Sequence, residues 1–165
     1  MANKAHLRIL SRWKVDVWNT YVQRHRLGDP DWGANLKAAD LRSVELHGVD
    51  FSHADLRGAR LSRTDLRDTS LWGANLRGAD LAGADLRGVD LAGSKLDGAK
   101  LNSARLAGAR LRGVSLREAD LSGCDLSLAN LIEADLSKAV LAGAELENAM
   151  FRDANLAGSD LTAAQ

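Results

Sequence analysis

The amino-acid sequence predicts a solenoid, a fold in which one short unit is stacked many times. Between residues 36 and 161, 26 positions are spaced five residues apart, and 24 of them are leucine. The other two are Phe51 and Phe151. A period of five matches neither the 3.6-residue period of an α-helix nor the two-residue period of a strand. A residue type that recurs at one place in every unit must occupy the same environment each time, which indicates stacked repeats.

Each five-residue unit has the same internal order. Two residues before each of the 26 positions the side chain is small, and alanine occupies 17 of these places. The residue directly before is Asp, Glu or Asn in 17 of the 26 units, and glycine often follows two residues after. Only one leucine after residue 33, Leu128, is out of phase. The unit is therefore A-D/N-L-x-x, with the leucine and the small residue expected to point inward.

This unit resembles that of the pentapeptide-repeat family, and the resemblance covers residues 34–165. It implies an all-β solenoid, a right-handed quadrilateral β-helix in which four units form one coil. The 26 pentapeptide repeats then make about 6.5 coils. Stacked at the spacing of β-strands, these coils form a rod about 30 Å long.

Residues 4–26 are predicted to form an amphipathic α-helix that caps the open first coil, since a solenoid exposes strand edges at its ends. We divide the chain into a helical capping segment, 1–30, and the repeats, 31–165. Trp32 is expected at the junction between them. The same helix is rich in basic residues, so attachment to a membrane surface is the alternative interpretation. One broad side of the helix carries its large side chains: Leu7, Leu10, Trp13, Val17, Trp18, Tyr21 and Val22.

At the other end the repeat continues almost to Gln165 without a cap. The last coil is therefore expected either to fray or to meet another chain, and it is a candidate surface for a homodimer. Residues 118–165 contain nine acidic and two basic residues. This charge disfavours the stacking of like ends into filaments.

The overall composition excludes some partners. The chain has 22 basic and 22 acidic residues, so we expect neither nucleic acid nor a membrane as its partner. No run of 18 apolar residues is present, and the single cysteine, Cys124, allows no internal disulfide. We therefore expect a cytoplasmic protein in which Cys124 is buried and reacts slowly.

No catalytic arrangement is evident, and we expect no enzyme activity, cofactor or metal. The histidines have no partners at the spacing of zinc ligands: His6, His25, His47 and His53. The many aspartates are interpreted as turn residues that pair with arginines: Arg57, Arg67, Arg77 and Arg87.

Two departures from the repeat are candidate binding features. Four successive units carry a basic residue where Asp or Asn is usual, which gives one coil a basic belt: Lys95, Lys100, Arg105 and Arg110, with Arg112 and Arg117 beside it. The belt either docks a partner or is neutralised by aspartates one coil away.

The second departure is apolar: Trp72, Ile132 and Met150 are expected to point outward on the face of Phe51 and Phe151. These side chains either form a contact surface or are single exposed apolar residues of the kind that most protein surfaces carry.

The function predicted from these observations is a non-enzymatic rod that docks an unidentified protein. One alternative comes from family members that mimic duplex DNA and modulate DNA gyrase. Such mimicry needs negative charge along the whole rod, and the basic belt opposes it. The other alternative is membrane-surface attachment through the N-terminal helix.

Overall fold

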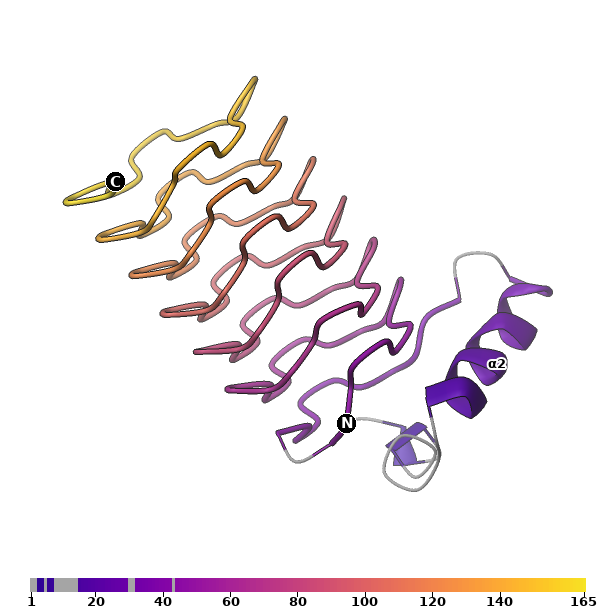
Figure 1. Ribbon diagram of the computed structural model, residues 1–165. Helices are drawn as coiled ribbons and strands as arrows, with labels where there is room; N and C mark the ends of the chain where they lie inside the picture. The colour runs from indigo at the N-terminus through magenta and orange to yellow at the C-terminus, as the bar shows by residue number, and fades with distance from the viewer. Residues whose placement is uncertain (1–2, 5, 8–14, 30–31, 43) are drawn as a thin grey trace.

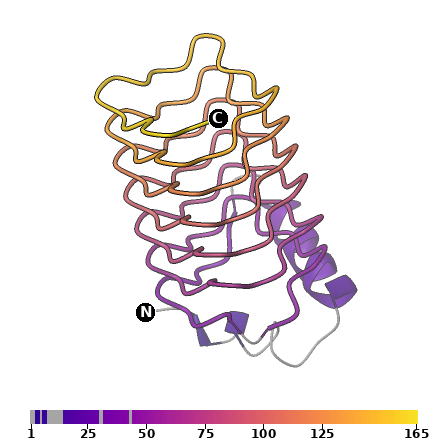
Figure 2. The same ribbon diagram turned by 60° about the vertical axis from the view of Figure 1, so that its left-hand side comes forward.

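The computed structural model describes residues 3–4, 6–7, 15–29, 32–42 and 44–165. From residue 34 onward the chain winds as a four-sided β-helix, with its coils stacked along one axis from the N-terminal to the C-terminal end (Figures 1 and 2). One helix, α2 (Val15–Arg26), lies beside the first coil. The predicted solenoid is confirmed.

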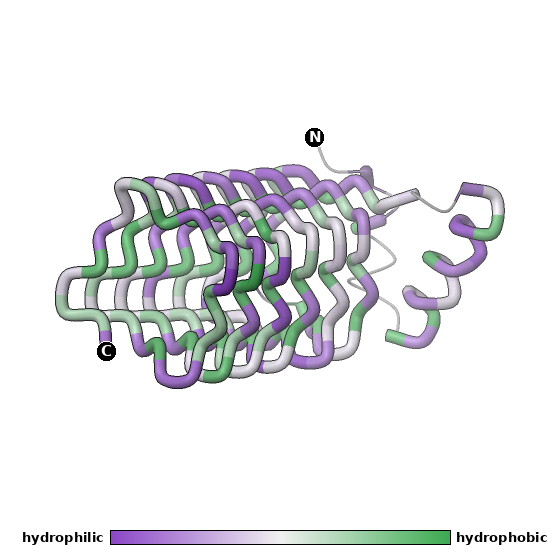
Figure 3. Tube along the Cα trace, turned by 90° about the horizontal axis from the view of Figure 1, so that it is seen from above, coloured by the Kyte–Doolittle hydropathy of each residue, from purple (hydrophilic) through white to green (hydrophobic). Residues whose placement is uncertain are grey.

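Backbone hydrogen bonds between coils fix the register. Single-residue parallel bridges join residues that precede an inward leucine or phenylalanine to the residue 20 further on, from Asn35↔Asp55 to Val140↔Asp160. In a central coil, the Leu96 N–H donates to the Ser115 carbonyl at 2.7 Å and the Gly98 N–H to the Arg117 carbonyl at 2.9 Å. Residues 20 apart therefore lie directly above one another, and residue types recur in rows along the rod (Figure 3).

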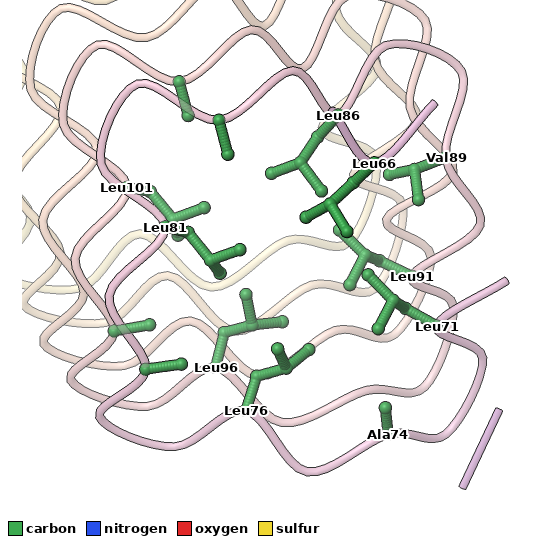
Figure 4. Packing of buried hydrophobic residues seen from close by; sticks show 14 of the residues in the cluster. Leu66, Leu71, Ala74, Leu76, Leu81, Leu86, Val89, Leu91, Leu96 and Leu101 are labelled. Atoms are coloured by element: carbon green, nitrogen blue, oxygen red, sulfur yellow. The ribbon is translucent and has the colours of Figure 1, made fainter. Parts of the chain in front are cut away.

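The interior is filled by the repeated leucines and small residues. Leu76 and Leu96 come from successive coils and point into the same space, as do Leu71 and Leu91 (Figure 4). These side chains are at most 1% exposed. Burial of one leucine stabilises the fold by roughly 1.5–3 kcal/mol, so the ladder is the main apolar contribution.

Each unit ends in a tight turn that needs a positive φ angle. In the unit of Leu96, the Ala99 N–H donates to the Leu96 carbonyl at 2.9 Å, and Gly98 between them has φ of 64°. Glycine adopts this left-handed conformation without steric cost, which explains why it follows so many of the leucines. At one such turn Leu128 stands instead, with φ of 59°.

The predicted helix over 4–26 is confirmed only in its second half, because α2 begins at Val15. Residues 4, 6 and 7 are also helical, and the predicted part over 8–14 lies outside the described residues. Within α2, Trp18 and Val22 are buried, but Val17 is 37% exposed. The buried stripe of α2 is therefore narrower than the broad apolar side that includes Val17.

Side chains of α2 bind backbone groups at the edge of the first coil. In later coils the equivalent groups bind the coil before, as when the Ser70 N–H donates to the Val49 carbonyl. At Asp50 these partners are side chains instead. The Asp50 N–H donates to Asn19 Oδ1 at 2.8 Å, and the Trp18 indole N–H donates to the Asp50 carbonyl at 2.9 Å. The helix thus satisfies strand-edge groups that would otherwise be unpaired.

Arg26 and a group of rings complete this junction. Arg26 forms an ion pair with Asp50 at 2.8 Å and donates to the Ser52 carbonyl at 2.6 Å. Trp32 stacks on His25 with ring centroids 4.7 Å apart, as expected for a residue at the junction. The rings that contact one another here are His6, Trp18, Tyr21, His25, Trp32 and Phe51.

The last coil is less covered than the others. Phe151 and Leu156 are partly exposed, and Leu161 is 42% exposed, whereas the ladder leucines from Leu36 to Leu141 are buried. The homodimer through this coil stays a prediction.

Substituting Asn19 tests the edge contacts. In Asn19→Ala, the Asp50 N–H and the Gly48 carbonyl lose their side-chain partners. Each lost partner costs about 1–3 kcal/mol where the group stays buried. We expect faster hydrogen exchange at Asp50 and a lower thermal midpoint by circular dichroism. Gln23→Ala, at an exposed position of the same helix, is the control and should change neither.

Candidate docking surfaces

One side of the rod gathers most of the apolar candidates, and we call it the Trp72 face: residues 50–53, 70–73, 90–93, 110–113, 130–133 and 150–153. The parallel ladder Ser70–Asp90–Arg110–Asn130–Met150 runs along it. Beside this ladder, the Gly73 N–H donates to the Ala92 carbonyl, the Gly93 N–H to that of Arg112, and the Gly113 N–H to that of Ile132. Five predicted residues therefore share this face: Trp72, Arg110, Arg112, Ile132 and Met150.

Trp72 is 49% exposed and is held at its edge by His53. The two ring centroids are 4.5 Å apart at 84°, an edge-to-face contact. Gly73 makes room for it, since a Cβ atom there would lie 3.1 Å from His53 Nδ1. In the next coil the position above Trp72 is Ala92, which leaves the indole open on that side. His53 thus supports the tryptophan from one edge.

The basic belt is not gathered on one surface. Its four members are spaced five residues apart, so each one lies on a different side of the rod. Only Arg110 and Arg112 lie on the Trp72 face, while Lys95 shares another side with Arg117. A single flat partner cannot contact the whole belt.

The belt is partly neutralised by the coils on either side of it. Arg105 pairs with Asp85 at 3.4 Å and Arg110 with Asp90 at 3.8 Å. Arg112 pairs with Glu133 at 2.8 Å. By contrast, Lys95 and Lys100 are exposed and have no carboxylate within 4.0 Å among the described residues. The neutralised interpretation of the belt therefore holds for its arginines but not for its lysines.

Asp97 is a second carboxylate beside the belt that binds side chains from neighbouring coils. It accepts hydrogen bonds from Arg77 at 2.6 Å, from Arg117 at 3.0 Å and from Ser115. Burial by itself would raise the pKa of Asp97, but the bonds from Ser115, Arg117 and Arg77 lower it to about 2. Arg117 is therefore part of an ion-pair ladder over three coils.

The two halves of the rod treat their aspartates differently. In the first half an arginine two residues later binds the carboxylate through two nitrogens: Asp40–Arg42, Asp55–Arg57, Asp65–Arg67 and Asp85–Arg87. A hydroxyl takes that place once in the first half, at Asp50–Ser52, and at three sites in the second half: Asp120–Ser122, Asp125–Ser127 and Asp160–Thr162. Both arrangements hold the turn, but a hydroxyl leaves the negative charge in place. The predicted pairings of Arg57, Arg67, Arg77 and Arg87 are confirmed.

Other candidate chemistry is limited within the described residues. Cys124 is buried, and burial raises the pKa of its thiol to about 12, which agrees with the expected slow reaction. No group of three His, Cys, Asp or Glu side chains that could hold a metal ion occurs in the described ranges. Among the same residues, no helix has the length and apolar character that crossing a bilayer requires.

The family model for pentapeptide repeats matches residues 32–58, 59–98, 94–131 and 129–164. The chain belongs to the pentapeptide-repeat family. The four-sided rod is accordingly the right-handed quadrilateral β-helix of this family. A comparison with curated protein sequences finds no match.

Several solved structures of pentapeptide-repeat proteins are similar to this chain. Rfr23 from the cyanobacterium Cyanothece 51142 is 20% identical, with 86% of this chain and 98% of that one covered and a TM-score of 0.47. HetL from Nostoc sp. strain PCC 7120, a protein involved in heterocyst differentiation regulation, is 27% identical, with coverage of 87% and 92% and a TM-score of 0.22. A trypsin-treated form of QnrB1, a plasmid-mediated fluoroquinolone resistance protein, is 23% identical, with coverage of 72% and 66% and a TM-score of 0.47.

The lowered pKa of Asp97 gives a pH prediction. A carboxyl whose pKa is lower in the folded state stabilises the fold above its unfolded pKa and loses this contribution as pH falls through the folded value. The thermal midpoint of the wild type should therefore fall between about pH 4 and about pH 2. Asp97→Asn should have a lower midpoint at pH 7 and a shallower fall across this window. Asp153→Asn, whose exposed carboxylate lies 3.7 Å from Arg152, is the control and should keep the wild-type slope.

Proposed function

We propose that this protein is a non-enzymatic docking rod that binds a partner protein through its Trp72 face. The observation that carries the proposal is the half-exposed indole of Trp72 on the face that also carries Arg110 and Arg112. Tryptophan and arginine are the residues most enriched among those that dominate protein–protein binding energies. The rod interior is filled with leucine and alanine, so its recognition chemistry lies on the outside.

The architecture supports such a role energetically. Every central coil is tied to its neighbours by backbone hydrogen bonds, so the outward side chains are held on a stiff framework. A preorganised surface loses little conformational entropy on binding. His53 adds to this by packing against the edge of Trp72.

The two alternative functions, DNA mimicry and membrane attachment, require surfaces of a different kind. Mimicry of duplex DNA, as a modulator of DNA gyrase, needs unneutralised negative charge along the rod, whereas arginines bind several aspartates of its first half, among them Asp40, Asp55 and Asp65. Membrane attachment needs a free apolar side on the N-terminal helix, whereas Trp18 and Val22 are buried against the rod. Neither alternative is favoured by a specific surface.

Affinity capture from a lysate of the source organism, with identification by mass spectrometry, tests the proposal. The wild type is compared with a Trp72→Glu, Arg110→Glu variant. We expect one or more proteins that the wild type retains and the variant loses. Arg105→Glu is the control for the arginine substitution, because it makes the same charge change as Arg110→Glu in the same coil on another side of the rod. It should retain the partner.

A partner that binds the double variant as well as the wild type would contradict the Trp72 face as the docking surface. Recovery of gyrase, together with an effect of the protein in a supercoiling assay, would favour DNA mimicry instead. Binding to anionic lipid vesicles that is lost on deletion of residues 1–30 would favour the membrane alternative.

A further inference from the structure

A second exposed apolar group lies at a corner of the rod, and we call it the Leu128 corner: Leu128, Met150 and Ile132. Leu128 is 64% exposed and Met150 is 46% exposed. The Met150 N–H donates to the Ala129 carbonyl at 2.9 Å, so Met150 lies one coil above and close to Leu128 along the chain. At strand and coil spacings their Cα atoms are no more than about 8 Å apart. Ile132, partly exposed, lies on the same side as Met150.

Leu128 occupies a position that the fold itself disfavours for leucine. Its φ of 59° is the left-handed conformation, which is adopted at the equivalent turns mostly by glycine or by polar residues. Among the described residues it is the one large aliphatic side chain at a positive φ. The side chain of Leu128 also buries little apolar surface that could offset this cost, since it points away from the core. Folding alone therefore gives no reason for a leucine at this turn.

Carboxylates without cationic partners surround the Leu128 corner. Glu147 lies in the next coil, one residue before the position above Leu128, and its carbonyl accepts the Leu128 N–H at 2.9 Å. Asp125 and Glu145 are stacked on the adjoining side, at the positions before the inward leucines. None of these three has a cation within 4.0 Å in the described part of the chain. Asp125 is bound by the Ser127 hydroxyl at 2.5 Å, which leaves its charge in place.

We propose that the Leu128 corner binds a cationic segment of a partner protein that also carries apolar side chains. This inference rests on the proposed docking function and names the chemistry of one segment that the rod recognises. Leu128 and Met150 supply the apolar contact, and Asp125, Glu145 and Glu147 supply the complementary charge. A nucleic acid or an anionic lipid surface would be repelled by the same carboxylates.

The corner adjoins the Trp72 face and shares Ile132 and Met150 with it. The arginines of that face are paired, Arg110 with Asp90 and Arg112 with Glu133, whereas the three carboxylates beside Leu128 have no cation within 4.0 Å among the described residues. The corner therefore differs from the rest of the face in its unpaired negative charge. Binding at the corner should weaken as salt rises, because its charges are exposed and screened.

The test measures binding of a fluorescein-labelled Leu/Lys peptide with helical periodicity by fluorescence anisotropy, using the full chain. Its Leu/Glu counterpart serves as the charge control. We expect saturable binding of the Leu/Lys peptide to the wild type. Leu128→Gly with Met150→Asp should weaken that binding by at least about fivefold. Glu145→Gln with Glu147→Gln should also weaken it and should reduce its dependence on salt.

The variants are chosen to keep the fold intact. Glycine is the common residue at the Leu128 turn and aspartate is the common residue at the Met150 position, so the double variant restores the repeat unit. Its thermal midpoint should equal or exceed that of the wild type. Val140→Asp is the matched control, since Val140 is an exposed apolar residue at the same place in its unit on another side. It should bind the peptide as the wild type does.

The proposal is overturned if the wild type does not bind the Leu/Lys peptide saturably, or if Val140→Asp weakens binding as much as the double variant does. It is also overturned if the protein alone sediments as a dimer that Leu128→Gly converts to a monomer, since the occupant is then a second copy. Capture of a protein through the Trp72 face without peptide binding would refute this inference alone. Peptide binding at the corner without such capture would refute only the Trp72 face.

Discussion

The hydrogen-bonded register of 20 residues between coils is the constraint on which the rest of this structure depends. It stacks equivalent residues directly, as in Lys100 between Asp80 and Asp120. Every column of side chains along the rod is then set by residues 20 apart in the sequence. A single substitution therefore changes one position in one column and leaves the backbone unchanged. This explains how a very regular interior can carry an irregular surface.

The residue that follows each inward leucine determines whether the aspartate before that leucine is neutralised. Where it is arginine, as at Arg67 and Arg87, the neighbouring aspartate is bound through two nitrogens. The bond from Arg67 lowers the pKa of Asp65 to about 2. Where it is serine, as at Ser122, the turn is held equally well but the carboxylate stays unneutralised. Zero net charge over the chain thus conceals an excess of basic residues over 1–117, with 20 basic and 13 acidic, and an excess of acidic residues over 118–165, with nine acidic and two basic.

The N-terminal edge shows how side chains can take the place of a missing coil. Trp18 supplies a donor and Asn19 an acceptor to the backbone of Asp50, while Arg26 binds both its carboxylate and the Ser52 carbonyl. Each group replaces a backbone partner that the next coils provide for themselves. The helix is therefore attached by directional contacts as well as by the burial of Trp18 and Val22.

The sequence by itself determined the solenoid, its inward ladder and the start of each turn, because a period of five repeats the same local environment 26 times. It also marked Leu128, the one leucine out of phase, though not what that residue does. Only the tertiary structure decided which outward charges are paired, since it joins Arg105 to Asp85 and Arg110 to Asp90 but leaves Lys95 and Lys100 without a carboxylate within 4.0 Å among the described residues. The contacts of α2 were likewise decided there, because they join side chains to a coil edge some 30 residues away. Periodicity determines which residues recur in each unit. Contacts between side chains of different coils, and contacts at the first coil, depend on the three-dimensional arrangement of the chain.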